Sequence, residues 1–446
     1  MDLSEGDLNL SPRGKAFRES RGGRGRELLE ADAKGFLHQS LSSPCLNALQ
    51  SASGSELIDL DGKRILDFHG NNVHLLGHGH PEVTKAVKAV LDRLPFCPRR
   101  YTNREAVDLS RKLCEKAGAG FDRALFAPGG SLAIGMALKV ARLATGRHKV
   151  LALEDSFHGA SLDAISVGGE ALFRDGLGPL FPGVTHMPPP VPASCGWDCG
   201  EHCNAACGGA IADRILEEGD YGAVLVETVR CTDVQIPPPV YYETIREACD
   251  RTGTLLILDE IPICLGRTGA WFTYQHYGIE PDILVLGKGL GGGVFPMAAM
   301  LTSSRFNEAV AHTAVGHYTH EKSPAGAAAG LATIGVLEKE RLVERSRSFS
   351  NEALKGLRAI SESSQVVREV RGLGLLFGVE IQNAPDGRPA ESVAEAILYD
   401  CLESGLSFKV GKGRVLALSP PLNVSEADWR KGLDCLARAV ERAELG

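Results

Sequence analysis

Two polar residues that follow short apolar runs in the middle of the chain are the best candidates for chemistry. The run at 255–258 ends in Asp259, and the run at 283–286 ends shortly before Lys288. Both runs have the length and aliphatic character of strands buried on two faces, and parallel strands deliver ligand-handling residues at their carboxyl ends. A buried carboxylate and a buried lysine at neighbouring strand ends suit pyridoxal phosphate, which needs a Schiff-base lysine and an acidic partner for its pyridinium nitrogen. The alternative is a buried salt bridge in an α/β core.

The composition indicates a globular α/β enzyme. The chain has 446 residues, of which 43% are hydrophobic and 23% charged, with 52 glycines. This length accommodates two or three subdomains around one main sheet. The net charge of -8 argues against a nucleic-acid partner. No apolar run is long enough to span a bilayer, and the first 15 residues lack the apolar core of a signal peptide, so we expect a cytoplasmic protein without membrane contact.

The pattern of apolar runs divides the chain into three stretches. We predict an N-terminal arm and hairpin at 1–75, a large domain at 76–340 and a small α+β domain at 341–446. The hairpin is indicated by apolar runs on either side of the Asp61-Gly62 turn. The last stretch alternates helix and strand, including one strand expected at 372–381.

Two further segments have the composition of anion-binding sites. Arg99 and Arg100 lie in a proline-bounded loop, where they either clamp an anion or are solvated. Gly129, Gly130 and Ser131 lie where a strand turns into a helix. The free N–H groups at a helix start attract phosphate, although an ordinary strand-to-helix turn has the same composition.

Two other predicted strands are also followed by residues with chemical potential. Phe157 and His158 come shortly after one strand, where an aromatic ring can cover a flat cofactor or simply fill the core. Glu227 and Arg230 come just after another strand, and they either pair with each other or face a ligand.

Four cysteines and four histidines raise the question of a metal. The cysteines recur at every fourth position, which departs from the usual C-x2-C pairs and favours unligated thiols. The histidines share one glycine-rich loop, but no matching carboxylate or cysteine pattern accompanies them, which favours loop hydrogen bonding. We therefore predict no metal site. The residues concerned are Cys195, Cys199, Cys203, Cys207, His69, His74, His78 and His80.

Taken together, these stretches resemble the class III aminotransferases, a family of pyridoxal-phosphate enzymes of fold type I. The resemblance runs from about Asp59 to the end of the chain, and its most specific part is DEIPICLGRTGAWF through PDILVLGKGLGGGVFP. It implies a large α/β domain with a mostly parallel seven-stranded sheet, a small α+β domain and pyridoxal 5'-phosphate as cofactor. It also implies a homodimer with shared active sites.

The resemblance implies a role for each matching residue. Lys288 matches the Schiff-base lysine, and Asp259 matches the partner of the pyridinium nitrogen. The other matches are the phosphate-binding turn, the ring-stacking pair, the active-site glutamate and a threonine donated to the partner subunit's phosphate site. These residues are, in that order, Gly129, Gly130 and Ser131; Phe157 and His158; Glu227; and Thr319.

Two departures from the family pattern bear on the substrate. Pro262 stands where the family has a glutamine that contacts the cofactor's phenolic oxygen, and proline has no side-chain donor. Ala417 stands where amino-acid transaminases of the family have an arginine that binds the substrate α-carboxylate. Arg414 is one strand turn away, which leaves it a poor substitute. The substrate is therefore expected to be an amine that carries its anion elsewhere.

Segments such as DFHGNNVH, LPFCPRRYTN and GHYTHEKSP resemble a narrower group, the (R)-1-hydroxy-2-aminoethylphosphonate ammonia-lyases of phosphonate catabolism. That resemblance implies an elimination that yields phosphonoacetaldehyde and ammonia from a small phosphonate. The alternative is an ω-aminotransferase that acts on an amine such as 2-aminoethylphosphonate with a keto-acid acceptor. Charge and location make four residues candidates for the phosphonate: Arg99, Arg100, Lys322 and Lys409.

Overall fold

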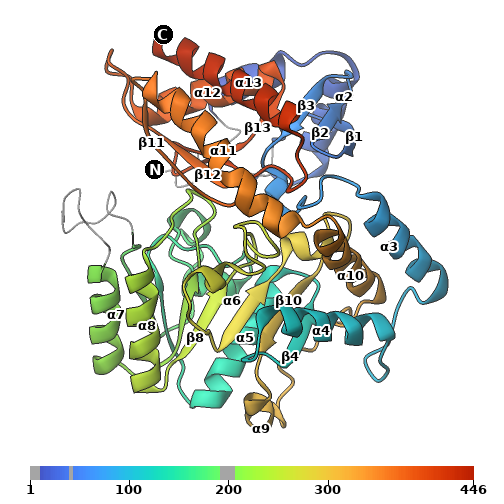
Figure 1. The fold of residues 1–446 in the computed structure, drawn as a ribbon, viewed down its shortest axis with the longest axis vertical. Coiled ribbons are helices and arrows are strands. Elements are labelled where there is room, and N and C mark those ends of the chain that lie inside the picture. Colours follow the sequence, from blue (N-terminus) through green and yellow to red (C-terminus); the bar gives the residue numbers. More distant parts are fainter. Residues whose placement is uncertain (1–10, 40–43, 191–205, 446) are drawn as a thin grey trace. The chain divides into compact units, whose positions relative to one another are not determined.

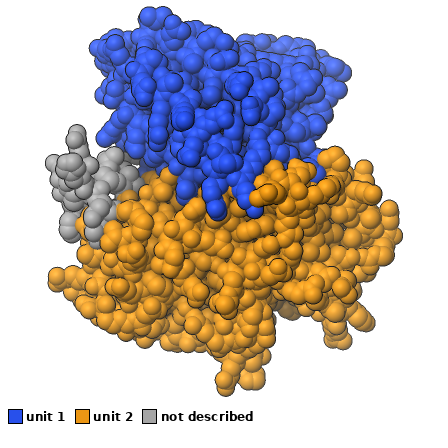
Figure 2. Space-filling view, in the orientation of Figure 1, with its two compact units in different colours: residues 1–80, 231–234, 344–446 blue, residues 81–230, 235–343 orange. Residues whose placement is uncertain are grey.

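The computed structural model describes residues 11–39, 44–190 and 206–445. The chain forms two compact units, which Figure 2 shows in blue and orange. Unit 1 consists of Met1–His80, Cys231–Val234 and Glu344–Gly446. Unit 2 consists of Pro81–Arg230 and Gln235–Val343.

Unit 2 is built on a seven-stranded sheet with the strand order β4-β10-β9-β8-β7-β5-β6. Only β10 is antiparallel to its neighbours, so the sheet is mostly parallel, as predicted. The strands are β4 (Arg123–Ala127), β5 (Lys149–Leu153), β6 (Val184–Met187), β7 (Tyr221–Glu227), β8 (Leu255–Asp259), β9 (Ile283–Leu286) and β10 (Ala298–Thr302).

The central strands of this sheet are hydrophobic because both faces are covered. Every residue of β7 and β9 is buried, and α5 (Gly130–Thr145) contacts β4, β7, β8, β9 and β10. Figure 1 shows the helices of unit 2 beside this sheet. Burial on both faces explains the continuous aliphatic runs in the sequence. The other helices are α3 (Pro81–Arg93), α4 (Arg104–Ala117), α6 (Leu162–Val167), α7 (Ala206–Glu218), α8 (Pro239–Thr252), α9 (Asn307–Val310) and α10 (Pro324–Lys339), with short 3-10 turns η2 (Ala171–Phe173), η4 (Thr273–His276), η5 (Lys288–Gly291) and η6 (Ser304–Phe306).

Unit 1 contains two four-stranded sheets, ordered β1-β2-β3-β13 and β11-β12-β15-β14. Their strands are β1 (Leu49–Ser53), β2 (Glu56–Asp59), β3 (Arg64–Asp67), β11 (Val367–Leu373), β12 (Leu376–Ile381), β13 (Leu406–Ser407), β14 (Lys409–Gly411) and β15 (Val415–Leu418). The helices are α1 (Pro12–Glu19), α2 (Gly23–Gly35), α11 (Leu342–Glu362), which begins at the end of unit 2, α12 (Ala390–Ser404) and α13 (Glu426–Leu445), with η1 (Gly70–Asn72) after β3. None of the described helices is long and apolar enough to cross a membrane.

Two turns in unit 1 test the sequence predictions. The predicted hairpin at Asp61-Gly62 is confirmed, since β2 and β3 pair antiparallel and Gly62 has a φ of 84°. The single strand predicted at 372–381 is wrong, because the run belongs to the antiparallel strands β11 and β12. Gly374, with a φ of 60°, makes the tight turn between them, and periodicity within an unbroken apolar run does not reveal such a turn.

Candidate active site

Asp259 and His158 form a buried pair at the carboxyl end of the parallel strands of unit 2. Asp259 is the last residue of β8, and His158 lies in the loop after β5. His158 Nδ1 lies 2.8 Å from Asp259 Oδ2, while Asp259 Oδ1 accepts a hydrogen bond from Ile261 N at 3.0 Å. Both residues are only 2% exposed. The carboxylate is therefore held in a fixed orientation by donors on both of its oxygens.

Glu227 places a second carboxyl group beside Asp259, at the carboxyl end of the neighbouring strand. It is the last residue of β7 and lies opposite Asp259 in the β7–β8 register. Its Oε1 accepts a hydrogen bond from Phe157 N at 3.1 Å and lies 3.8 Å from Arg230 Nε. Burial raises the pKa of Glu227 to about 7, and the nearby Asp259 charge also raises it, while Arg230 and His158 act in the opposite direction.

Arg230 is buried at the centre of three carboxyl groups. Its Nη1 lies 3.6 Å from Asp155 Oδ2, and its Nη2 lies 3.7 Å from Glu170 Oε1. The sequence left open whether Glu227 and Arg230 pair with each other or face a ligand. In the structure they pair with each other. The sequence reasoning missed Asp155 and Glu170 as partners, although Asp155 follows β5 as closely as other candidates follow their strands.

Lys288 lies at the end of β9 in an unusual backbone conformation. It begins η5 with a φ of 42°, a region that residues other than glycine rarely occupy. Such strain costs about 1–3 kcal/mol and is concentrated at functional sites. The expectation of a buried lysine is wrong, because Lys288 is exposed while Gly287 and Gly289 on either side are buried. The turn thus projects the side chain away from the packed backbone.

The start of α5 brings the predicted phosphate-binding residues against the loop after β5. Gly129 caps the helix, and Gly130 is its first residue. Ser131 Oγ accepts a hydrogen bond from Ala160 N at 3.2 Å. A Cβ atom on Gly129 would meet no atom within 4 Å, whereas one on Gly130 would lie 2.8 Å from Ile261 Cδ1. The first N–H groups of a helix have no partner within the helix, so the start of α5 can donate to an anion.

Phe157 lies in this loop in a half-buried position. Its ring centroid is 4.4 Å from that of Phe173, and the two planes make an angle of 40°. One side of the Phe157 ring is therefore supported by another aromatic side chain. His158, the other member of the predicted ring-stacking pair, instead uses Nδ1 to contact Asp259.

Two exposed loops of unit 2 carry the remaining candidates in this unit. Arg99 contacts the imidazole of His317, and Asn103 Nδ2 donates to the backbone oxygen of Lys322 at 3.0 Å. Lys322 also lines a cavity of about 360 Å³ beside α4. The side chains of Arg99, Arg100, Thr319 and Lys322 are all exposed.

The last candidate, Lys409, lies in unit 1. It is a half-buried residue of β14, and its Cα is paired with that of Ala417 in β15. Arg414, by contrast, lies 3.7 Å from Glu380 Oε1, a carboxylate that also binds Arg371 at 2.8 Å. Of the four cysteines considered as ligands, Cys195, Cys199 and Cys203 lie outside the described residues, and Cys207 lies in α7.

The residues of unit 2 fit the cofactor implied by the sequence. Asp259 is a buried, oriented carboxylate of the kind that binds a pyridinium nitrogen, and the start of α5 offers N–H groups to a phosphate. His158 Nε2 is buried and has no hydrogen-bond partner among the described residues. Lys288 would supply the amine that bonds to the cofactor's aldehyde.

Comparison with known proteins shows similarity along nearly the whole chain. Residues 39–440 match the family model for class III aminotransferases. The chain is 46% identical to the (R)-1-hydroxy-2-aminoethylphosphonate ammonia-lyase of Vibrio splendidus, over 98% of this chain and 95% of that protein. It is 33% identical to the acetylornithine aminotransferase of Methanothermobacter thermautotrophicus, over 93% of this chain and 98% of that protein.

Solved structures show the same similarity in three dimensions. An amine transaminase from an uncultivated Pseudomonas species, with pyridoxal phosphate bound, has a TM-score of 0.84 at 28% identity and covers 92% of this chain and 99% of its own. The taurine:2-oxoglutarate aminotransferase of Bifidobacterium kashiwanohense has a TM-score of 0.87 at 24% identity, over 96% and 99% of the two chains. At that identity the likeness establishes the fold alone.

Proposed function

We infer the activity from one premise: this chain belongs to the class III aminotransferase family, and its cofactor is pyridoxal phosphate. We propose that it is an ammonia-lyase that converts (R)-1-hydroxy-2-aminoethylphosphonate to phosphonoacetaldehyde and ammonia in phosphonate catabolism. The observation that carries this proposal is the 46% identity over 98% of the chain to the Vibrio splendidus enzyme of that name.

In this proposal the residues of unit 2 hold and tune the cofactor. When bound, pyridoxal phosphate withdraws electrons from the substrate carbon that bears nitrogen. Asp259 keeps the pyridine nitrogen protonated, and His158 positions Asp259 through the 2.8 Å contact. The N–H groups at the start of α5 bind the phosphate. Glu227, whose pKa is raised to about 7, is able to exchange a proton near neutral pH.

Lys288 is assigned two tasks. Its amine holds the cofactor before the substrate arrives, and it then takes the proton from the carbon that bears nitrogen. As this C–H bond breaks, its electron pair forms a C=C bond, and the hydroxyl group leaves the neighbouring carbon with a proton, as water. The released enamine tautomerises to an imine, and water hydrolyses the imine to phosphonoacetaldehyde and ammonia. The reaction consumes no amino acceptor, because the amino group leaves as ammonia.

The register of the β14–β15 hairpin supports Lys409 as the partner of the substrate phosphonate. Residues paired across neighbouring strands project from the same face of a sheet, so Lys409 and Ala417 share a face. Lys409 therefore places a cation next to the position where the family resemblance expects an arginine. Arg414 is the weaker candidate because it precedes β15 and lies three residues before Ala417. Lys322, Arg99 and Arg100 remain alternatives for the same role.

A class III aminotransferase activity is the second candidate. The acetylornithine aminotransferases at 33% and 32% identity favour it, since these relatives also match most of the chain. In that case an amine such as 2-aminoethylphosphonate would transfer its amino group to a keto acid. Fold and cofactor are common to both activities and do not distinguish them.

The requirement for an acceptor separates the two activities. Purified enzyme with bound pyridoxal phosphate is incubated with (R)-1-hydroxy-2-aminoethylphosphonate and no keto acid, and ammonia and aldehyde are measured over time. The lyase releases both products over many turnovers. A transaminase stops after one equivalent per active site and resumes when pyruvate is added, and that result would refute the lyase assignment. The matched substrate control is 2-aminoethylphosphonate, which has no hydroxyl group to eliminate.

We also propose a homodimer in which Thr319 reaches the cofactor phosphate of the partner subunit. The exposure of Thr319 in unit 2 supports this, since a residue that serves a partner must lie at the surface of its own chain.

A further inference from the structure

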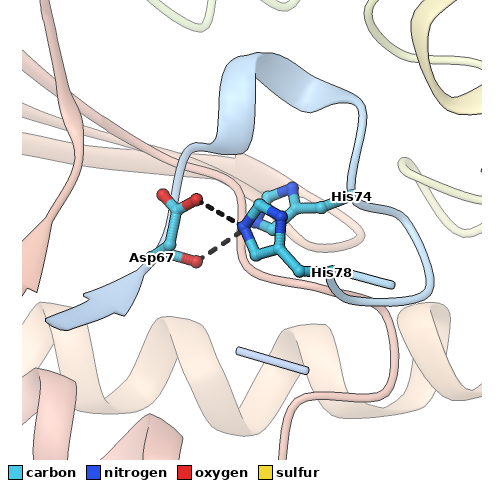
Figure 3. A group of neighbouring side chains, drawn as sticks. All are labelled: Asp67, His74 and His78. Carbon is cyan, nitrogen blue, oxygen red and sulfur yellow. Dashed lines mark hydrogen bonds and ion pairs between the residues drawn. The ribbon is translucent and has the colours of Figure 1, made fainter. Parts of the chain in front are cut away.

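Three side chains that lie outside the residues assigned to the cofactor converge in unit 1 (Figure 3). Asp67 is the last residue of β3, and His74 and His78 lie in the loop that follows η1. One ligand atom from each residue lies within 4.8 Å of the other two. Asp67 and His74 are buried, and the side chain of His78 is 18% exposed, so the cluster meets solvent at His78.

The contacts within the cluster hold both histidine rings against Asp67. His78 Nε2 lies 2.9 Å from Asp67 Oδ2, and His74 Nε2 lies 3.1 Å from the backbone oxygen of Asp67. Asp67 Oδ1 accepts hydrogen bonds from His69 N at 3.0 Å and Gly70 N at 2.9 Å. These backbone donors hold one carboxylate oxygen, so that the other faces the histidines. Hydrogen bonds of this kind orient the ligands in metal sites.

The backbone around the cluster is tightly constrained. Gly70 has a φ of 47°, and a Cβ atom there would lie 2.3 Å from His74 Nδ1. Gly54 and His78 exchange two backbone hydrogen bonds, at 3.1 Å and 2.8 Å. A Cβ atom on Gly77 would lie 2.9 Å from the Cα of Gly54. Glycine is therefore required beside both histidines, and the ligand groups stand on fixed backbone.

We propose that Asp67, His74 and His78 form a binding site for a divalent zinc ion. Two imidazole nitrogens and one carboxylate oxygen are the donors that zinc takes when three protein ligands leave a fourth position for water. Tetrahedral ligands at zinc are about 3.4 Å apart, given bond lengths of about 2.0–2.2 Å. The Asp67–His78 pair lies at 2.9 Å and no pair exceeds 4.8 Å, so modest side-chain rotations produce this spacing.

Zinc at this position would cross-link the end of β3 to the loop at 73–78. The sequence showed no carboxylate spaced to accompany the histidines as a metal ligand, but the fold brings the carboxylate of Asp67 to them. Asp67 is eleven residues before His78 and reaches it because the loop folds back over the strand end. The alternative is a hydrogen-bonded cluster that binds no ion. Measurement of zinc binding distinguishes the two.

The test uses full-length, tag-free holoenzyme that has been treated with a chelator and dialysed. Zinc is added back, and the bound metal per chain and its dissociation constant are measured. His78→Gln is the informative variant, because the glutamine amide can still donate to Asp67 but is a poor zinc ligand. His80→Gln, in the same loop but outside the cluster, is the matched control. Cys199→Ser separates this site from zinc bound by the cysteine-rich segment.

We expect one zinc ion per chain in the wild type, in His80→Gln and in Cys199→Ser. In His78→Gln the dissociation constant should rise at least about 100-fold, since the loss of even an outer-shell partner weakens metal binding by 10- to 100-fold. Zinc should raise the melting temperature of the wild type and His80→Gln, but not that of His78→Gln. The proposal is overturned if the wild type binds no stoichiometric zinc, or if His78→Gln binds zinc as tightly as the wild type. If His78→Gln does not fold, His74→Gln provides the same comparison.

Discussion

Replacing His158 by alanine should weaken the cofactor site through Asp259. The bond between His158 Nδ1 and Asp259 Oδ2 is 2.8 Å long, and both residues are 2% exposed, so water does not replace it easily. A hydrogen bond to a charged group contributes about 1.5–3 kcal/mol. If the hydrogen bond stabilises Asp259 in its reactive orientation by this free energy, kcat/KM of His158→Ala for ammonia release should be roughly 10- to 150-fold below that of the wild type.

The control for this variant is His158→Asn. The asparagine Nδ2–H lies where the histidine Nδ1–H lies, so it can restore the donor to Asp259 without the ring. We expect it to recover most of the activity lost in His158→Ala. Pyridoxal-phosphate affinity, measured by absorbance titration, and the melting temperature are recorded for both variants to separate a local effect from unfolding. The reasoning is refuted if His158→Ala stays within about twofold of the wild type, or if both variants lose the same activity.

Four further outcomes are expected. Asp259→Ala should bind pyridoxal phosphate but turn over poorly, because an unprotonated pyridine is a weak electron sink, and near-normal turnover would remove Asp259 from this role. Lys409→Met should raise KM for the phosphonate about 10-fold or more with little change in kcat, whereas Lys409→Arg should retain affinity; equal KM values in all three proteins would assign the phosphonate to another cation. Glu227→Gln should flatten the pH dependence of stability. The folded pKa of about 7 exceeds the ordinary 4.5, so the wild type is stabilised below pH 4.5 and loses up to about 3 kcal/mol as the pH rises to 7, which urea unfolding at pH 5 and 8 can measure. Sedimentation should show a dimer, and Thr319→Ala should weaken pyridoxal-phosphate binding while the dimer persists; a fully active monomer would contradict the shared site.

The sequence by itself determined the fold class, the family and the cofactor. The aliphatic runs that became β8 and β9 are local features, and so is the helix start at Pro81. A strand buried on both faces must be apolar along its length, so its position can be read without knowledge of its neighbours. Asp259 directly follows one such run, and Lys288 comes two residues after the end of the other. These positions suggested the cofactor, and the resemblance to class III aminotransferases supported it.

Only the tertiary structure decided which of these groups contact one another. His158 and Asp259 are 101 positions apart, and β7 lies between the strands that carry them. Lys409 faces Ala417 because of the β14–β15 register, and Asp67 reaches His78 because the loop folds back. Such contacts depend on strand order, register and the path of loops. A shift of one residue in register would move every side chain of a strand to the opposite face, and local periodicity does not specify that choice across distant strands.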